Sequence, residues 1–549
     1  MLVIARIDIV CSGYAAGNQS YSMNHVTNNI RVHCCETMPM KEGYMSILDS
    51  YTTTFGLVKK IDAFGYLDYL KQHPNEPRKH GKVLLVTADT PLKASRGEGK
   101  TTTTIALVDA LRERGVDAAA VLRQPSMGIT AAGSKGGASG GGKSSLSHPE
   151  LIDWGLCGEM AAIACAQNLL VSFAEKAVDE GVLDTILVPR VSEVPSRSLR
   201  SIAVDFGKGT VPERVVLTPT CELMQIVVLS RSMDEISERV AAMIAGTKDG
   251  VPRKFGDFVD LWRITNILAD AVKPAKTETI NGSPIYVHCG PFANVSLGIP
   301  SLVSVEMACA EHDVVVVEAG YGTDAGAQKW LDIASREFGA AWPAAAVVVT
   351  RATTWRDDET LAWRYPFHVA RLESLNIPTF PLINLWEGED NQVPELLTQA
   401  KSLGFRKPIV GNLFRDGGDG LADQLDDFVS VISADAETQV PESRRGKALL
   451  DRVKLLCEEA YGVPTERVIE KAGFEDSLSA AEDLCANAGV DFNSLALVAV
   501  KSPATMTDDD HKPAEERTVT LKKVEVHAGA GVVQVNLTSS LTTPMPKIV

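Results

Sequence analysis

The chain has 549 residues, of which 45% are hydrophobic and 23% charged, as in folded globular proteins of about two to four domains. The net charge of −16, from 54 basic and 70 acidic residues, argues against binding nucleic acid or an anionic membrane through overall charge. No run of about 18 uncharged apolar residues predicts a membrane span. The ten cysteines are scattered without a C-x-x-C pair, which favours a reduced, cytoplasmic protein over a zinc site or a disulfide framework.

Residues 1–55 differ in composition from the rest of the chain. The first 35 residues contain a single acidic residue, Asp8, and show little periodicity. We expect a disordered or extension tail, with Met38, Met40 or Met45 as candidate functional starts. Because acidic residues are scarce, an organelle-targeting segment is the alternative.

The stretch SRGEGKTTTTIALVDAL (Ser95–Leu111) has the pattern of a phosphate-binding loop that opens a helix. Before it, KVLLVTA (Lys82–Ala88) is a short apolar run that predicts a buried strand. After Thr101 the apolar residues recur at helical spacing. A strand, a glycine-rich loop and a helix N-terminus together form the usual setting of a phosphate site. The strict motif has glycine where this chain has Ala94.

The residue types in this loop suit a nucleotide phosphate. Gly97 and Gly99 allow the backbone to approach an anion, and the first helical turn offers free N–H groups. Lys100 supplies a mobile positive charge, and the Thr101 hydroxyl is the candidate magnesium ligand. A plain glycine turn is the alternative. The predicted nucleotide-binding residues are Gly97, Glu98, Gly99, Lys100, Thr101 and Thr102.

A second glycine-rich stretch, Leu122–Ser145, comes after the next predicted strand. It is too long for a simple turn, and it leaves the carboxyl end of a strand, where open α/β sheets bind ligands. Arg123, Lys135 and Lys143 would add positive charge there. A flexible surface loop is the alternative.

Beyond the tail, short apolar runs alternate with helical patterns, which predicts an α/β fold with a parallel sheet covered on both faces. Linker-like compositions occur at Ala245–Asp257, Arg351–Glu359 and Glu437–Lys447. The predicted helices include Ser232–Gly246 and Val393–Leu403. The predicted strands are Lys82–Ala88, Ala118–Leu122, Val314–Glu318, Ala344–Thr350, Pro378–Ile383 and Pro408–Gly411.

Five motifs occur in the order typical of formate–tetrahydrofolate ligases, and the chain resembles a divergent member of that family from about residue 60 to 546. The resemblance implies a P-loop NTPase-like, doubly wound, mostly parallel domain at 56–350, with smaller α/β domains at 351–445 and 446–549. It further implies Mg-ATP, formate and tetrahydrofolate as ligands, with a monovalent cation allowed, and a homodimer or homotetramer. The motifs are GEGKTTTT (Gly97–Thr104), LRQPSMG with KGGASGGG, HCGPFANVSLG (His288–Gly298), EAGYGTDAGAQKWLDI (Glu318–Ile333) and HAGAGVVQVNLTSSLTTPMP (His527–Pro546).

The resemblance also implies roles for single residues. Arg123 would clamp a formyl phosphate, and Trp386 and Phe414 would bracket the flat pterin, although core packing is the ordinary role of a lone aromatic residue. Phe292 and Asn294 of the HCGPFAN motif would bind ligand. Lys100, Arg123, Gln124 and Glu159 are the candidate catalytic residues.

Three positions at the presumed formate end of the site depart from the family pattern, as do Glu193, Pro195 and Ser196 further along the chain. Gln124 stands where the family has a carboxylate, Gly155 where it has histidine, and Glu159 where it has aspartate. These departures predict weaker formate-dependent turnover, which Gly155→His with Gln124→Glu would raise. The alternatives are a ligase for another acid or acceptor and a nucleotide-binding regulatory homologue. We expect His288 near the ligand, and His148 in an exposed loop.

Overall fold

The computed structural model describes residues 47–55, 58–91, 97–127, 130, 139–205, 210–213, 215–352, 359–434 and 439–537. The chain divides into two compact units, Met1–Ser50 and Tyr51–Val549. In the first unit the described residues form a short helix, α1 (Ile47–Ser50). Residues 1–46 of the predicted tail, Lys135, and residues 353–358 of a predicted linker lie outside the described residues.

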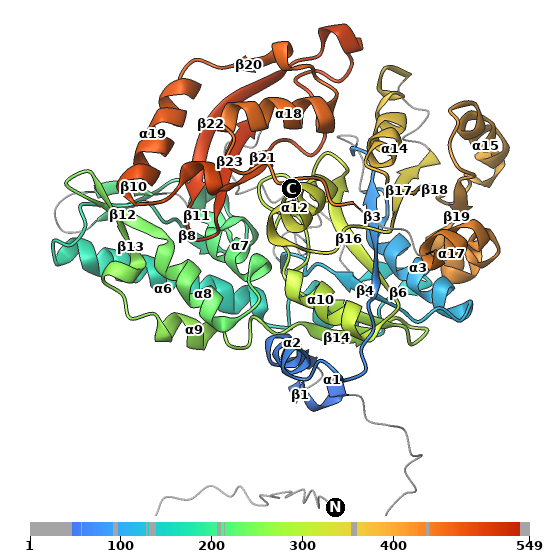
Figure 1. The fold of residues 1–549 in the computed structure, drawn as a ribbon, viewed down its shortest axis with the longest axis horizontal. Coiled ribbons are helices and arrows are strands. Elements are labelled where there is room, and N and C mark those ends of the chain that lie inside the picture. Colours follow the sequence, from blue (N-terminus) through green and yellow to red (C-terminus); the bar gives the residue numbers. More distant parts are fainter. Residues whose placement is uncertain are drawn as a thin grey trace, which may run out of the picture. The chain divides into compact units, whose positions relative to one another are not determined.

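A large mixed sheet organises the second unit, and seven of its ten described strands run parallel (Figure 1). The remaining three, at one edge, pair antiparallel. This confirms the predicted α/β class with a mostly parallel sheet. In spatial order the strands are β1 (Thr52–Phe55), β2 (Val58–Ile61), β14 (Ala275–Glu278), β15 (Pro284–Val287), β4 (Ala118–Leu122), β16 (Val314–Gly322), β3 (Lys82–Ala88), β17 (Ala345–Arg351), β18 (Thr379–Asn384) and β19 (Ile409–Gly411).

The predicted strands of this sheet are confirmed, with bounds that differ by a few residues. β3 and β4 begin and end where the apolar runs do, and β16 continues four residues beyond Glu318, to Gly322. β1 covers Thr52–Phe55, so the fold begins inside the segment predicted as a tail.

Both faces of the sheet are buried. Alternate residues of β3, such as Leu84 and Val86, pack in one core with helix α3 (Lys100–Glu113), while Val83 and Leu85 between them are equally buried. Helices α10 (Leu302–Glu311) and α14 (Arg364–Ser374) also contact the strands. This double burial explains why the strands read as continuous apolar runs.

Residues of the predicted second domain, 351–445, contribute β18 and β19 to the large sheet. Residues of the predicted third domain form their own four-stranded sheet, with a separate core that includes α18 and α19. Its strands are β20 (Val468–Glu470), β22 (Val519–His527), β23 (Val532–Leu537) and β21 (Ala496–Val500). Among the described residues, the other α-helices of at least five residues are α2 (Ala63–Gln72), α5 (Pro149–Asp153), α6 (Glu159–Asp179), α7 (Glu222–Leu229), α8 (Met233–Ala242), α9 (Trp262–Leu268), α15 (Val393–Ser402), α17 (Asp426–Ser433), α18 (Leu449–Tyr461) and α19 (Phe474–Asn487).

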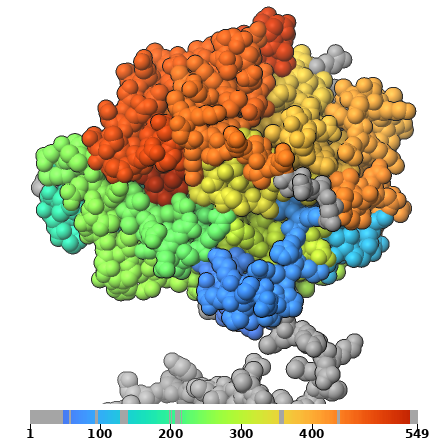
Figure 2. All heavy atoms as spheres, viewed as in Figure 1, coloured from blue at the N-terminus to red at the C-terminus, as the bar shows by residue number. Residues whose placement is uncertain are grey.

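The C-terminal sheet packs on the segment around α7 and α8, and Figure 2 shows the red and green surfaces in contact. The Gly529 N–H donates to Glu222 Oε1 at 2.7 Å, and Arg239 Nη1 donates to the Ala530 carbonyl at 3.2 Å. Burial raises the pKa of Glu222 to about 7, although the backbone donors Ala530 and Gly529 act in the opposite direction.

One predicted linker is wrong. Ala245–Asp257 forms most of a hairpin, in which β12 (Ile244–Lys248) pairs antiparallel with β13 (Val251–Lys254). The turn residues that suggested a linker, Asp249 and Gly250, both have positive φ and make the tight turn. The helix predicted at Ser232–Gly246 accordingly ends at Ala242. The shorter strand pairs are β5 (Gly140–Gly141) with β6 (Ser144–Ser145), β8 (Arg190–Ser192) with β11 (Val215–Leu217), β9 (Ile202–Asp205) with β10 (Thr210–Glu213), and β12 with β7 (Thr185–Ile186).

Candidate functional site

The predicted phosphate loop lies between the end of β3 and the start of α3. Gly97 and Gly99 have φ of +115° and +91°, so both use the left-handed freedom of glycine. Gly99 is the N-cap of α3 and makes no side-chain cap. The first turn of α3, which includes Thr101 and Thr102, therefore directs backbone N–H groups toward the loop.

Asn384, at the end of β18, holds the loop from the neighbouring part of the sheet. Its Nδ2 donates to the Glu98 carbonyl at 3.1 Å, and a Cβ built on Gly99 would lie 2.3 Å from the same nitrogen. Any larger residue at position 99 would displace this amide. Asn384 was missed in the sequence analysis, although it lies two residues before Trp386, in the stretch INLWEG.

Lys100 lies back over its own loop. Its Nζ is 3.4 Å from Glu98 Oε2, and the two side chains are 11% and 1% exposed. The ammonium group is therefore positioned beside the N-terminus of α3 by a carboxylate that is itself buried. This arrangement places a positive charge next to the free backbone donors of the helix.

A buried carboxylate, Glu318, joins the phosphate loop to the end of β4. Its Oε1 accepts a hydrogen bond from the Thr101 hydroxyl at 3.3 Å and lies 3.2 Å from Arg123 Nη2. The Arg123 and Glu318 side chains are 8% and 4% exposed. Glu318 was also missed as a site residue, even though it opens the EAGYG motif.

Gln124 uses its amide as a donor. Its Nε2 donates to the Ile152 carbonyl at 2.5 Å and to the Pro125 carbonyl at 3.3 Å, while its buried Oε1 has no hydrogen-bond partner among the described residues. A carboxylate at this position would face two carbonyl oxygens. These two carbonyl acceptors favour an amide at position 124, so the predicted gain in turnover from Gly155→His with Gln124→Glu would come with a local structural cost.

Gly155 has a φ of +66°, and a Cβ built there would meet only the Met127 Cβ, at 3.7 Å. Space for a side chain is therefore present at the Cβ. Histidine at this position would still take a left-handed conformation, which costs roughly 1 kcal/mol or more. Gly155→His carries this backbone cost in addition to any effect on catalysis.

Glu159 begins α6 and reaches the HCGPFAN segment. Its Oε1 accepts the Cys289 N–H at 2.8 Å, and its Oε2 is buried without a hydrogen-bond partner among the described residues. Burial raises the pKa of Glu159 to about 7. The Gln124 N–H donates to the Cys289 carbonyl at 2.7 Å. The backbone of Cys289 therefore links Gln124 and Glu159, two of the predicted catalytic residues.

The prediction that His288 lies near the ligand is wrong. Its Nδ1 is 2.6 Å from Ser301 Oγ and its Nε2 is 2.7 Å from the Ala271 carbonyl, so both ring nitrogens are used within the core. Burial lowers the pKa of His288 to about 4. His148 is exposed, as expected, and lies 3.4 Å from Glu150. Burial raises the pKa of Cys157 to about 12 and that of Cys289 well above its usual value, which makes both poor nucleophiles.

A buried histidine that the sequence analysis missed supports the segment after β3. His368 of α14 accepts the Thr90 N–H at its Nε2, at 3.2 Å, and its Nδ1 is 2.5 Å from Thr323 Oγ1. Burial lowers the pKa of His368 to about 3 and raises that of neighbouring Asp89 to about 7. No sequence motif marks this helix position.

The end of the second glycine-rich stretch packs against Phe414. Lys143 N donates to the Phe414 carbonyl at 2.9 Å, and a Cβ built on Gly141 would lie 2.8 Å from the Phe414 ring. On Gly142 a Cβ would lie 2.0 Å from the Phe414 carbonyl oxygen. Glycine is therefore required for this close approach, and residues 139–145 are held against the helix α16 (Leu413–Asp416).

Trp386 and Phe414 lie just beyond the carboxyl ends of β18 and β19, which are neighbouring parallel strands. Their side chains are 43% and 63% exposed. Exposed large aromatic side chains at this edge of a sheet are typical of a binding surface. The Arg351 guanidinium lies over the Trp386 ring, 3.8 Å from its centroid, and occupies one of the two ring faces.

The HCGPFAN residues Phe292 and Asn294 differ in their surroundings. Phe292 is partly buried against the small cluster of Val215 and Leu217. Asn294 is buried, and its carbonyl accepts the Lys501 N–H at 2.9 Å. The neighbouring Ala293 approaches Gly320, where an added Cβ would lie 2.8 Å from both Ala293 Cβ and Arg123 Nη1. The HCGPFAN segment therefore packs against the backbone of Gly320, next to the Arg123 guanidinium.

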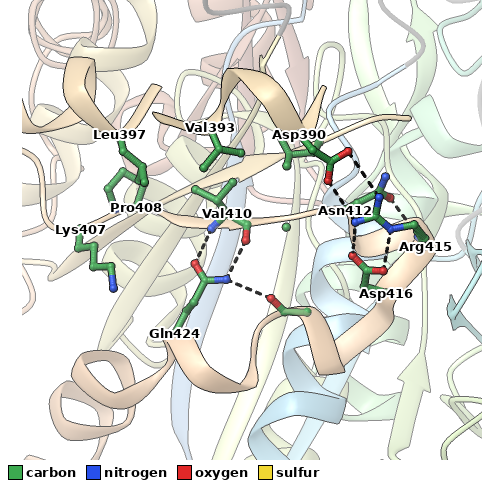
Figure 3. A pocket seen from close by; sticks show the side chains of 13 residues that line it. Asp390, Val393, Leu397, Lys407, Pro408, Val410, Asn412, Arg415, Asp416 and Gln424 are labelled. Carbon is green, nitrogen blue, oxygen red and sulfur yellow. Dashed lines mark hydrogen bonds and ion pairs between the residues drawn. The ribbon is translucent and has the colours of Figure 1, made fainter. Parts of the chain in front are cut away.

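A cavity of about 320 Å³ lies beside β19 (Figure 3). Gln424 closes one side of it and binds both the N–H and the carbonyl of Val410. On the other side Arg415 forms ion pairs with Asp390 and Asp416. Leu385 and Asn412 also line this cavity, and each lies close in the chain to one of the two exposed aromatic residues.

Within the described part of the chain, no cluster of three or more histidine, cysteine or acidic side chains could hold a metal ion. The described helices include none that is long and apolar enough to cross a membrane.

Comparison with known proteins connects this arrangement to one family. The family model described as "Formate--tetrahydrofolate ligase" matches residues 44–358. A formate–tetrahydrofolate ligase of Bifidobacterium longum is 76% identical over 505 residues, covering 92% of this chain and 100% of the relative. Formate–tetrahydrofolate ligases of Myxococcus xanthus (31% identical, 85% and 88% covered) and Thermotoga maritima (29% identical, 90% and 93% covered) are more distant. The chain therefore belongs to the formate–tetrahydrofolate ligase family.

Proposed function

We propose that the protein is an ATP-dependent formate–tetrahydrofolate ligase that makes 10-formyltetrahydrofolate through formyl phosphate. The observation that carries this proposal is the 76% identity to the Bifidobacterium ligase over the whole length of that relative. Such identity does not favour the alternatives of another acid substrate or of a regulatory homologue without turnover.

In this proposal the phosphate groups of ATP bind at residues 97–102, in a P-loop NTPase-like site. The backbone N–H groups of the first turn of α3 and the Lys100 ammonium would donate to phosphate oxygens. Thr101 and Glu318, whose oxygens lie 3.3 Å apart, offer the hard oxygen ligands that Mg²⁺ prefers. Bound magnesium would neutralise phosphate charge during transfer.

Arg123 is proposed to hold the acyl phosphate. A formate oxygen attacks the γ-phosphorus, the bond to ADP breaks, and formyl phosphate results. The folate amine then attacks the formyl carbon, phosphate leaves, and the amine loses a proton. Positioning and positive charge dominate such transfers, and the planar Arg123 guanidinium suits an oxyanion.

Glu159 is proposed as the group that holds a proton near the acyl phosphate. Its pKa of about 7 allows it to exchange a proton near neutral pH, and Oε2, which has no hydrogen-bond partner among the described residues, is the atom that would do so. Gln124 follows Arg123 in the chain, and its amide donates to the carbonyl oxygens of Ile152 in α5 and of Pro125. We propose that Gln124 acts by holding the segment after Arg123 against α5.

The pterin is proposed to stack on Trp386 and Phe414. Both rings are exposed at the carboxyl edge of the sheet, and Arg351 leaves one face of Trp386 for a ligand. Phe292 and Asn294 remain predicted ligand-binding residues. The boundaries of the three domains, a monovalent cation and a homo-oligomer are also retained as predictions of the family resemblance. A cytoplasmic location is retained as a prediction from the scattered cysteines.

A coupled assay of ADP release tests the function. Formate and tetrahydrofolate are added separately and together to the protein with Mg-ATP, and 10-formyltetrahydrofolate is measured directly. We expect sustained ADP release only with both substrates, matched by an equal amount of product. ADP release without formyl transfer would contradict the proposal.

A further inference from the structure

A second cavity, of about 430 Å³, lies apart from the phosphate loop and is lined by three arginines. Arg336 begins the helix α12 (Arg336–Phe338), Arg371 belongs to α14, and Arg444 precedes α18. Their side chains are 5%, 4% and 9% exposed. None of these arginines belongs to the site proposed for ATP, formate or folate.

The three arginines share one carboxylate. All three lie within 3.4–3.8 Å of Asp332, which belongs to the π-helical turn Trp330–Ser335. Arg444 also pairs with Glu459. Among the described residues, Asp332 and Glu459 are thus the carboxylates within ion-pair distance of the three guanidinium groups, while Glu337 and Asp324 act on Arg336 and Arg371 from further away. At the rim, exposed Lys447 and Glu442 carry opposite charges.

The donors in this cluster are incompletely used. The Nε atoms of Arg371 and Arg444 are buried and have no hydrogen-bond partner among the described residues. Burial lowers the pKa of Arg336 and Arg371 below the usual range, and the neighbouring Arg444 acts in the same direction. Buried charges are normally paired one to one, whereas these three guanidinium groups share Asp332 as a common partner.

We propose that this cavity, which we call the triple-arginine site, binds the phosphate group of a small molecule. Planar guanidinium groups match the geometry of phosphate oxygens. Ser374 and Ser443 also line the cavity, and their hydroxyls donate to the Arg371 carbonyl and to Glu337. Leu375 and Leu455 provide an apolar wall for an organic portion. The guanidinium groups would bind the phosphate oxygens of a free phosphate ion and of a phosphate monoester in the same way.

Calorimetry with inorganic phosphate, and separately with glucose 6-phosphate, tests the proposal on the full chain. All variants are made in a Lys100→Ala background, which weakens phosphate binding at the ATP site. Arg444→Gln should weaken phosphate binding at least about tenfold, as expected for the loss of a charge-assisted hydrogen bond. Tighter binding of the ester would identify a phosphorylated metabolite as the ligand, and equal or weaker binding would identify free phosphate.

Two further variants keep the test decisive. Lys447→Gln changes an exposed rim residue, so folding is retained, and it should weaken phosphate binding severalfold. Lys471→Gln is the matched control, since it removes an exposed lysine outside the cavity lining and should not change phosphate affinity. Absence of saturable binding in the Lys100→Ala background, or equal affinity in Lys447→Gln and the background, would overturn the proposal.

Discussion

Arg123 Nη2 lies 3.2 Å from Glu318 Oε1, and both side chains are almost completely buried. The same carboxylate oxygen accepts the Thr101 hydroxyl of the phosphate loop. One buried acid thus joins the start of α3 to the end of β4, and it orients the guanidinium before any substrate is present.

Glu318→Gln should destabilise the protein by about 3 kcal/mol, because it leaves the buried Arg123 cation without its charged partner. Urea unfolding measures the change. The partly exposed pair of Arg231 and Glu306 provides the control, and Glu306→Gln should cost about 1 kcal/mol or less. Equal costs for the two variants would show that the Arg123–Glu318 pair has no special role.

Lys100→Ala should weaken Mg-ATP binding about 10- to 100-fold, the usual range for losing a charged hydrogen bond to phosphate. Calorimetric titration of the wild type and the variant provides the measurement. Lys176→Ala removes an exposed lysine that pairs with Glu180 and should leave the affinity unchanged. If both variants bind ATP as the wild type does, residues 97–102 do not form the phosphate site.

Gln124→Glu should lower stability by about 2 kcal/mol, because its carboxylate would face the Ile152 and Pro125 carbonyl oxygens. Thermal and urea unfolding measure this loss. The exposed Gln72→Glu should change stability by only about 0.5 kcal/mol. A variant of unchanged stability and higher formate-dependent turnover would instead support a carboxylate at position 124.

Tetrahydrofolate should quench Trp386 fluorescence, and the quenching should disappear in Trp386→Phe. Phe414→Ala should weaken folate binding by about 1–3 kcal/mol, the range known for bases stacked on aromatic side chains. Trp262→Phe, at another exposed tryptophan covered by Arg263, is the control. Unchanged folate affinity in Phe414→Ala would place the pterin elsewhere.

Glu222 should contribute a loss of stability as pH rises from about 4.5 to about 7, since in this window the buried carboxyl keeps a proton that the unfolded chain releases. The buried His288 and His368, whose pKa values are lowered, contribute in the opposite direction. Glu222→Gln keeps an oxygen acceptor for Gly529 and Ala530 but cannot titrate, so the loss due to Glu222 should be absent from its pH dependence. The difference in slope approaches at most about 1.4 kcal/mol per pH unit. Urea unfolding at several pH values, with exposed Glu113→Gln as control, checks this; identical slopes for wild type and Glu222→Gln would contradict it.

The large sheet and the strand, glycine loop and helix around Gly97–Thr101 could be predicted because their signals are local. A buried parallel strand needs a continuous apolar run, as in Lys82–Ala88, and a helix N-terminus facing an anion needs glycine beside it. The hairpin at β12 and β13 was mistaken for a linker because its short strands contain polar residues, and only pairing across the turn shows their conformation.

The α/β class, the strand–loop–helix at Gly97–Thr101 and, through the ordered motifs, the family follow from the sequence alone. Which distant groups meet at the proposed site depends on the tertiary structure. Glu318, within β16, and Asn384, at the end of β18, reach the loop before α3 because both strands run parallel in the same sheet. Tertiary structure also made His288 a core residue, since its hydrogen-bond partners come from other segments. Such pairings depend on strand order and burial, which no local sequence pattern encodes.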